Sequence, residues 1–352
     1  MAGEAERTVR ALGSFANQGS ESEHYEWFIC SWEKLIIIIE KLKKPVTIAS
    51  EKCQICVIKE GGFLAMSKEA AKTGSEPTIL SALEQNLPIG ERILVDELSY
   101  KIQPTGMKFF ITMMKPFMKS VISASEKKAA PGMWGGLLCR KRYIDEKLLD
   151  SIDQVQQVVN LGAGLDTRLY RLSGIQHLPA WELDQQQNIE AKLAAFTRAL
   201  KQIPSNIKLV PIDFDRENIM DILVKNGFDP GKKAFFIWEA VSQYLTKDGI
   251  DSIFSFLSQA KAGSLITFTY IHQDFIDGKN LFGWESGYKR FVKNNLFIYG
   301  MNPDKVDAFL SAYGYKLIED LDYSQMSERY IKPTGRKLAA AKLEHMVLAE
   351  KL

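Results

Sequence analysis

The chain has 352 residues, of which 46% are apolar and 25% are charged, which is the composition of a globular protein with a sizeable core. A formal net charge of +2 gives no electrostatic reason to expect a nucleic-acid partner. Four cysteines (Cys30, Cys53, Cys56 and Cys139) are too few for a disulfide scaffold and are typical of a reducing compartment.

The start of the chain favours a cytoplasmic protein without a membrane span. MAGEAERTVR mixes acids with bases and no apolar run follows it, so we expect no secretory signal. The most apolar short run, residues 35–39, is far below the roughly 20 residues that cross a bilayer. Residues 107–122 are interrupted by Lys115, Pro116 and Lys119, and we interpret them as a buried or amphipathic pair of helices.

Residues 1–75 differ from the rest and predict an appended segment of uncertain structure. A helix is expected over 27–42, and short strands over 46–49 and 55–58. Residues 67–77, SKEAAKTGSEP, are typical of a flexible linker. The pair Cys53 and Cys56 has no second pair and no nearby histidine, so no metal site is expected.

Residues 76–150 predict a helical lid in front of the main domain. Apolar residues recur at helical spacing over 79–87 and 92–102, with Pro88 between these segments. A further helix is expected over 141–154. The basic run RKR at 140–142 stands at the start of this helix.

From residue 155 onward, short apolar runs alternate with helical segments. Strands are expected at 158–162, 180–184, 208–214, 234–240 and 264–271, with helices over 186–203, 219–226 and 247–262 between them. A helix over 303–313 precedes two more strands, 315–321 and 344–351, which have no full crossover between them. The pattern predicts an α/β fold, a Rossmann-like core over about 155–352, in which seven mostly parallel strands end on an antiparallel one.

The segment VVNLGAGLDTRLYRL, residues 158–172, places two glycines directly after the first of these strands. Glycine permits a sharp turn and the close approach of a ligand, and the following helix would offer free N–H groups. The third glycine of the dinucleotide pattern G-x-G-x-x-G is replaced by Thr167, and Asp166 would repel a pyrophosphate. Gly162 and Gly164 therefore favour S-adenosylmethionine over a dinucleotide as the cofactor.

Carboxylates stand at the ends of the next strands. Asp184 comes 22 residues after Gly162, where an acid can accept both ribose hydroxyls, although a helix N-cap is the alternative. Asp213 and Phe214 could flank an adenine ring, with a plain strand-end turn as the alternative. Glu239 would face the methionine end of the cofactor. A buried acid requires a positive partner, which a cationic ligand would supply; a salt bridge to a nearby lysine or arginine is the alternative.

The motifs NLGAGLDTRLYRL, WELDQQQ, IDF and WEAVSQYL together resemble the leucine carboxyl methyltransferase family, which includes enzymes acting on a protein C-terminus and on small microbial molecules. The resemblance covers residues 78–352 and implies the class I methyltransferase fold. It also implies that Arg142, with Arg140 as the alternative, contacts the cofactor carboxylate, while a solvated charge run remains open for either arginine.

Two departures from the family pattern are visible. Gln186 and Gln187 stand where the family often has a proline region after the second strand. Ala240 replaces the glycine of the motif E-G-x-x-x-Y-L on the fourth strand. Neither change removes a charged group.

The expected function is O-methylation of a carboxylate or hydroxyl on a small molecule, within a methyltransferase domain over 76–352. A protein C-terminal carboxyl methyltransferase, a catalytically silent binding module and an NAD-dependent oxidoreductase are the alternatives. A carboxylate acceptor needs no general base, whereas a hydroxyl needs one. Tyr244, Tyr270 and His272 stand near strand ends and are the candidates for contacting the acceptor. The oligomeric state stays open.

Overall fold

A computed structural model describes residues 76–128, 131–214 and 216–352. The helix expected over 27–42, the strands over 46–49 and 55–58, and the Cys53 and Cys56 pair lie outside the described residues. Of the expected linker, only Glu76 and Pro77 are described, and both belong to the first helix of the described chain, α4 (Glu76–Glu84).

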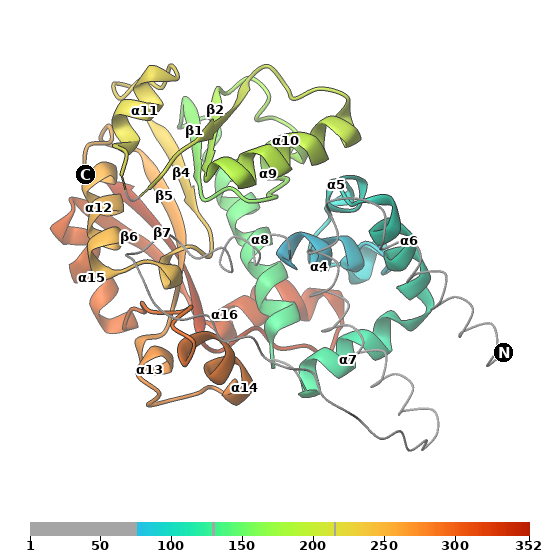
Figure 1. Ribbon diagram of the computed structural model, residues 1–352. Helices are drawn as coiled ribbons and strands as arrows, with labels where there is room; N and C mark the ends of the chain where they lie inside the picture. Colours follow the sequence, from blue (N-terminus) through green and yellow to red (C-terminus); the bar gives the residue numbers. More distant parts are fainter. Residues whose placement is uncertain (1–75, 129–130, 215) are drawn as a thin grey trace, which may run out of the picture. The chain divides into compact units, whose positions relative to one another are not determined.

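A seven-stranded sheet forms the centre of this part of the chain (Figure 1), with the order β3-β2-β1-β4-β5-β7-β6. Its strands are β1 (Gln157–Leu161), β2 (Ala180–Asp184), β3 (Ile207–Pro211), β4 (Ala234–Trp238), β5 (Leu265–Ile271), β6 (Tyr315–Leu321) and β7 (Glu344–Lys351). The first five are parallel, and β7 runs antiparallel to both of its neighbours. The predicted class I methyltransferase topology is confirmed.

The residue types of the central strands explain their position. Every residue of β1, β2, β4 and β5 is buried; β4 is a continuous apolar run, AFFIW, and β5 is interrupted only by Thr267 and Thr269. Continuous apolar runs of this kind suit parallel strands that are covered on both faces. The chain order reverses between β1 and β4, so the crevice at the carboxyl ends of these strands is where a ligand is expected.

Helices cover both faces of the sheet. Side chains of α11 (Ile219–Lys225), α12 (Lys247–Leu257) and α15 (Pro303–Ala312) join the strands in one large apolar cluster. The other face is covered by α8 (Met133–Asp150), α9 (Arg168–Arg171) and α10 (Gln186–Leu200), which lie together in Figure 1. The sheet is thus the middle layer of three.

Short helices precede α8 and lie to its right in Figure 1. They are α4, η1 (Ile89–Glu91), α5 (Glu97–Lys101), α6 (Thr105–Met114), η2 (Lys115–Phe117) and α7 (Met118–Lys128). The helix expected over 92–102 is confirmed only in its second half. The helix begins only at Glu97, because the side chain of Asp96 accepts the N–H of Ser99 and so caps α5.

Two further groups of short helices connect the last strands. Between β5 and β6 lie α13 (Gln273–Ile276), α14 (Glu285–Gly287), a π-helical turn η4 (Tyr288–Val292) and α15. Between β6 and β7 lie α16 (Tyr323–Met326), η5 (Ser327–Ile331) and η6 (Lys332–Thr334). Within the described ranges, no helix has both the length and the apolar character needed to cross a membrane.

Candidate functional site

The glycine turn links β1 to α9. Gly162 has φ 71° and Gly164 has φ 42°, in the region that favours glycine. A Cβ on Gly162 would lie 2.6 Å from Cγ2 of Val241, so the turn has no room for a side chain on that side. The N–H groups of Gly162 and Ala163 both donate to the carbonyl oxygen of Leu183, which fixes the turn against β2.

Asp184 lies at the carboxyl end of β2 and is 3% exposed. Its Oδ2 accepts the N–H of Gly164 at 2.7 Å, and its Oδ1 accepts from the backbone of Gln185 and the side chain of Asn188. The N-cap residue of α10 is Gln185, so Asp184 is not the cap. A carboxylate offers about four acceptor positions, which leaves room beside these three donors for a hydroxyl group.

The pair Asp213 and Phe214 follows β3. The Asp213 carboxylate is half exposed and lies 3.7 Å from the exposed Arg216 guanidinium. Phe214 is partly buried against the large apolar cluster formed by the sheet with α11, α12 and α15. Both residues therefore stand at the carboxyl edge of the sheet, one strand beyond Asp184.

Glu239 follows β4 directly and makes more ion pairs than any other carboxylate of the site. Its Oε1 accepts from Arg140 Nε at 2.9 Å, and its Oε2 accepts from Arg168 Nη2 at 2.9 Å. Lys141 Nζ lies 3.7 Å from Oε1. The burial of Glu239 is therefore explained by cations of this chain and does not by itself require a cationic ligand.

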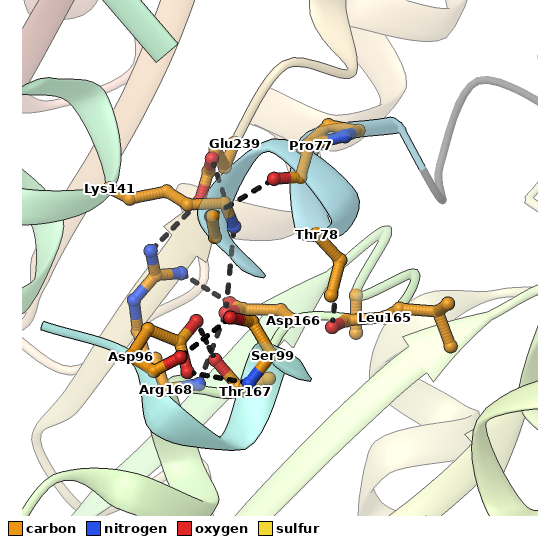
Figure 2. A network of polar contacts seen from close by, with 12 residues as sticks. Pro77, Thr78, Asp96, Ser99, Lys141, Leu165, Asp166, Thr167, Arg168 and Glu239 are labelled. Carbon is orange, nitrogen blue, oxygen red and sulfur yellow. Dashed lines mark hydrogen bonds and ion pairs between the residues drawn. The ribbon is translucent and has the colours of Figure 1, made fainter. Parts of the chain in front are cut away.

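Around Glu239 lies a larger cluster, which we call the ionic network; Figure 2 shows part of it, including Lys141, Asp166 and Arg168. Arg168 is fully buried and pairs with Asp166, Asp145 and Glu239. The whole network contains four cations (Arg140, Lys141, Arg168 and Arg171) and five carboxylates (Asp96, Asp145, Asp166, Glu239 and Glu344). The formal net charge of the network is therefore −1.

The helical lid contacts the turn through two hydrogen bonds. Thr78 of α4 donates from Oγ1 to the carbonyl oxygen of Leu165, and Thr167 donates from Oγ1 to Asp96 Oδ2 at 2.7 Å. Figure 2 shows these groups beside Asp166 and Arg168. Residues more than 70 positions apart in the chain therefore meet at the end of β1.

The side chains of the two candidate arginines, Arg140 and Arg142, lie on different faces of α8. Arg140 is 7% exposed and bridges Glu239 and Glu344. Arg142, two positions along α8, is exposed and donates from Nη1 to the carbonyl oxygen of Ile93 in the lid. Residues two apart on a helix lie on different faces, which is why only Arg140 joins the network.

The network fixes the protonation of its acids. Burial alone would raise the pKa of Glu239, but the charges of Lys141, Arg168 and Arg140 outweigh it and lower the pKa to about 2. Burial would likewise raise the pKa of Asp166, and Arg168 and Lys141 hold it well below its usual range. Both carboxylates are ionised at neutral pH.

The three acceptor candidates have different surroundings. Tyr270 is fully buried, and its hydroxyl donates to Asp320 at 2.8 Å. His272 is partly buried, and its Nδ1 accepts the N–H of Asp274. Tyr244 is also partly buried. It packs edge-on against Phe297 in an apolar cluster to which α13 and η4 contribute side chains. His272 and Tyr244 lie near this cluster, whereas Tyr270 belongs to the core of the sheet.

Several members of the network cannot be recognised from the sequence alone. Asp166 and Arg168 stand in the GLDTR run, where the sequence pattern indicates only the glycine turn and the repulsion of a phosphate by Asp166. Glu344 and Asp96 carried no sequence signal, because one begins the last strand and the other caps a short lid helix. No group of three histidine, cysteine or acidic side chains within the described residues could hold a metal ion.

The sequence of this chain is similar to those of known proteins. A sequence model described as leucine carboxyl methyltransferase matches residues 76–258, slightly more than half of the chain. The chain belongs to the leucine carboxyl methyltransferase family. The match begins at α4 and ends just after α12, so it includes the lid, the glycine turn, Asp184 and Glu239.

The chain is also similar to individual named proteins and to solved structures. A protein of Mycobacterium avium is 27% identical over 207 residues, which are 57% of this chain and 68% of that protein. A protein of Mycobacterium marinum is 28% identical over 207 residues, which again are 57% of this chain and 68% of that protein. Both carry the provisional name of S-adenosyl-L-methionine-dependent methyltransferase. A crystal structure of a provisionally named methyltransferase from Thermobifida fusca is 13% identical, covers 78% of this chain and 94% of that one, and has a TM-score of 0.48.

The expected family is confirmed, and with it the coarse activity, methyl transfer that depends on S-adenosylmethionine. The predicted cofactor agrees with the names of these relatives. The residues of the site fit such a molecule, because the glycine turn, the remaining acceptor position of Asp184 and the half-buried Phe214 line the carboxyl edge of the sheet.

Proposed function

We propose that this chain methylates a carboxylate oxygen of a small molecule, with S-adenosylmethionine as the donor. When bound, this cofactor supplies a methyl group on a positively charged sulfur, and an oxygen lone pair forms the new bond as the carbon–sulfur bond breaks. Alignment of the two reactants alone can supply roughly 7–11 kcal/mol in favourable cases. The protein's task is then mainly to hold both in line.

The observation that carries the choice of a carboxylate is the state of His272. Because the N–H of Asp274 donates to its Nδ1, the neutral ring carries its proton on Nε2. Burial lowers the pKa of His272, so the neutral form prevails at pH 7. Such a ring can donate a hydrogen bond to an acceptor but cannot take a proton from one. Tyr270 is equally unsuited, because it donates to Asp320.

We assign the cofactor contacts residue by residue. Asp184 accepts from the ribose, and Asp213 and Phe214 flank the adenine. Glu239 attracts the ammonium group and Arg140 the carboxylate of the methionyl moiety, with Arg142 as the second choice because it is turned toward the lid. The single negative charge in excess on the ionic network matches the single positive charge that the cofactor carries in total, from its sulfonium, ammonium and carboxylate groups.

The acceptor's body is proposed to be apolar. Half-buried rings, among them Phe282, Tyr288 and Phe291, pack against the buried cluster beside Tyr244 and His272, and their exposed parts offer apolar surface to a ligand. This set favours a ligand with an aromatic or aliphatic body over a sugar or a phosphate.

Calorimetric titration with S-adenosylmethionine, S-adenosylhomocysteine and NAD tests the cofactor. We expect micromolar binding of the first two, no binding of NAD, and loss of binding in Asp184→Ala. A folded protein that binds neither adenosyl compound would refute the proposal.

The acceptor class is tested by transfer of a tritiated methyl group to a panel of aryl and alkyl carboxylic acids and of matched phenols. A methyl ester releases labelled methanol in alkali, whereas a methyl ether is stable. Label in an alkali-stable ether would overturn the carboxylate. Label only in a peptide that ends in a free carboxylate would point to a protein substrate, and cofactor binding without transfer to any acceptor would favour a silent binding module.

A further inference from the structure

Lys192 and Glu182 form an ion pair from which water is fully excluded. Both side chains are 0% exposed, and Lys192 Nζ donates to Glu182 Oε1 at 2.7 Å. Lys192 lies on α10 and Glu182 on β2, two residues before Asp184. Lysine and glutamate are rarely buried to this degree, so the position of the pair calls for an explanation.

The second contact of the ammonium group is the glycine turn. Lys192 Nζ lies 3.4 Å from the carbonyl oxygen of Ala163, the residue between Gly162 and Gly164. That oxygen also accepts the N–H of Asp166 at 2.9 Å, which closes the turn. At 3.4 Å the ammonium group acts on the carbonyl mainly by electrostatic attraction.

The other polar and aromatic contacts of the pair come from Tyr170 and Phe196. Glu182 Oε2 accepts the hydroxyl of Tyr170 at 2.6 Å. The ammonium group lies 5.6 Å from the centre of the Tyr170 ring and 5.3 Å from that of Phe196, within the range of cation–π attraction. Tyr170 belongs to α9, the helix that the turn leads into, so the pair joins β2, α10 and α9 beneath the turn.

Strand geometry relates this pair to the cofactor site. Residues two apart on a strand point to the same face, so Glu182 and Asp184 both face the turn from β2. Asp184 holds the N–H of Gly164, and Glu182 acts through Lys192 on the carbonyl of Ala163, which belongs to the same peptide group. The peptide between Ala163 and Gly164 is thus fixed at both its polar ends.

Stability alone does not account for the pair. The cost of removing two charges from water roughly cancels their attraction, and apolar replacements of buried pairs are often neutral or stabilising. What the pair adds is a fixed orientation of one peptide at the turn.

We propose that Lys192 and Glu182 are positioning residues, which hold the Ala163–Gly164 peptide in the orientation that binds S-adenosylmethionine. The inference rests on the proposed use of this turn as the cofactor site. It predicts that the pair affects cofactor affinity far more than the rate of methyl transfer once the cofactor is bound.

The test is the double variant Glu182→Gln/Lys192→Met in the full chain, with dissociation constants for S-adenosylhomocysteine from calorimetry and unfolding midpoints from circular dichroism. Because both charges are removed together, no unpaired charge is buried. We expect a midpoint within a few degrees of the wild type and a dissociation constant raised about tenfold or more. With an acceptor in hand, KM for the cofactor should rise while kcat stays near its original value.

Two further variants separate positioning from loss of stability. Tyr170→Phe keeps the ring and the ion pair and should bind normally. Leu257→Ala in the distant core should lower the midpoint without weakening binding. If the double variant does not fold, Glu182→Asp, which keeps both charges but shortens the side chain that holds Lys192 beside the turn, should fold and bind several-fold more weakly.

A folded double or Glu182→Asp variant that binds as tightly as the wild type would refute the positioning role. Failure of the wild type to bind S-adenosylhomocysteine would instead refute the cofactor assignment, so the two proposals fail in distinguishable ways.

Discussion

Ala240 adopts a backbone conformation that suits glycine, with φ 55°, directly after Glu239. Its N–H donates to Thr269 Oγ1 at 2.9 Å, which holds the strained peptide in place. The family pattern has glycine at this position, so the alanine adds strain beside the most heavily paired carboxylate of the site. Strain of this kind is commonly stored at functional sites.

Ala240→Gly should therefore stabilise the protein by about 0.5–1 kcal/mol, because a left-handed conformation costs less for glycine. Urea unfolding gives the free energy directly. Ala194→Gly, an exposed position inside α10, is the matched control and should have the opposite sign. Equal destabilisation by both changes would mean that the strain at Ala240 is not released.

Glu239 makes stability depend on pH. Its pKa is about 2 in the folded chain, against an ordinary value of 4.5, because Lys141, Arg168 and Arg140 outweigh the effect of burial. The folded state therefore holds the proton less tightly than the unfolded state. The resulting stabilisation is fully present above pH 4.5 and is lost as pH falls toward about 2.

Unfolding free energies of the wild type and Glu239→Gln, measured between neutral pH and pH 3, test this linkage. The difference between the two proteins should shrink as pH falls through this range. A difference that is constant with pH would contradict the depressed pKa of Glu239.

At the scale of elements, the glycine turn is tightened from two sides. Val241 occupies the space where a side chain on Gly162 would go. On the other side, Asp184 of β2 accepts the N–H of Gly164. The turn follows a strand and precedes a short helix, as the sequence predicts. Its contact with Val241 could not be predicted, because that residue is 79 positions away and reaches the turn only through the pairing of β1 with β4.

Gly162→Ala should destabilise the protein by at least about 1–2 kcal/mol, the usual cost of the left-handed conformation, plus the cost of displacing Val241. It should also weaken S-adenosylhomocysteine binding. The double variant Gly162→Ala/Val241→Ala relieves the contact but not the backbone conformation, so it should recover only part of the stability. Thermal and urea unfolding measure both.

At the scale of the whole described chain, Glu84 and Arg336 tie the lid to the C-terminal part. Arg336 Nη1 donates to Glu84 Oε1 at 2.6 Å, and the same carboxylate accepts from Trp134 Nε1 and the N–H of Ile93. The Glu84 side chain is 0% exposed and that of Arg336 is 9% exposed. These residues are 252 positions apart, so the contact forms only when the fold is complete.

Arg336→Met leaves the Glu84 carboxylate buried without its cation and should cost about 3–5 kcal/mol of unfolding free energy. The double variant Glu84→Gln/Arg336→Met removes both charges and should be several-fold less destabilised. Urea unfolding of the two singles and the double gives the coupling energy. Additive effects of the two changes would mean that the residues do not interact.

The sequence by itself determined the strands, the parallel sheet with its antiparallel end and the glycine turn, because these depend on local periodicity and on glycine at a turn. It also placed Asp184 and Glu239 at strand ends, since parallel strands end at one edge. Only the tertiary structure decided that Arg140 rather than Arg142 meets Glu239, that Tyr270 is buried against Asp320, and that Lys192, Asp96 and Glu344 join the site. These contacts depend on which face of a helix or strand meets another element, and that choice is made by packing between distant segments.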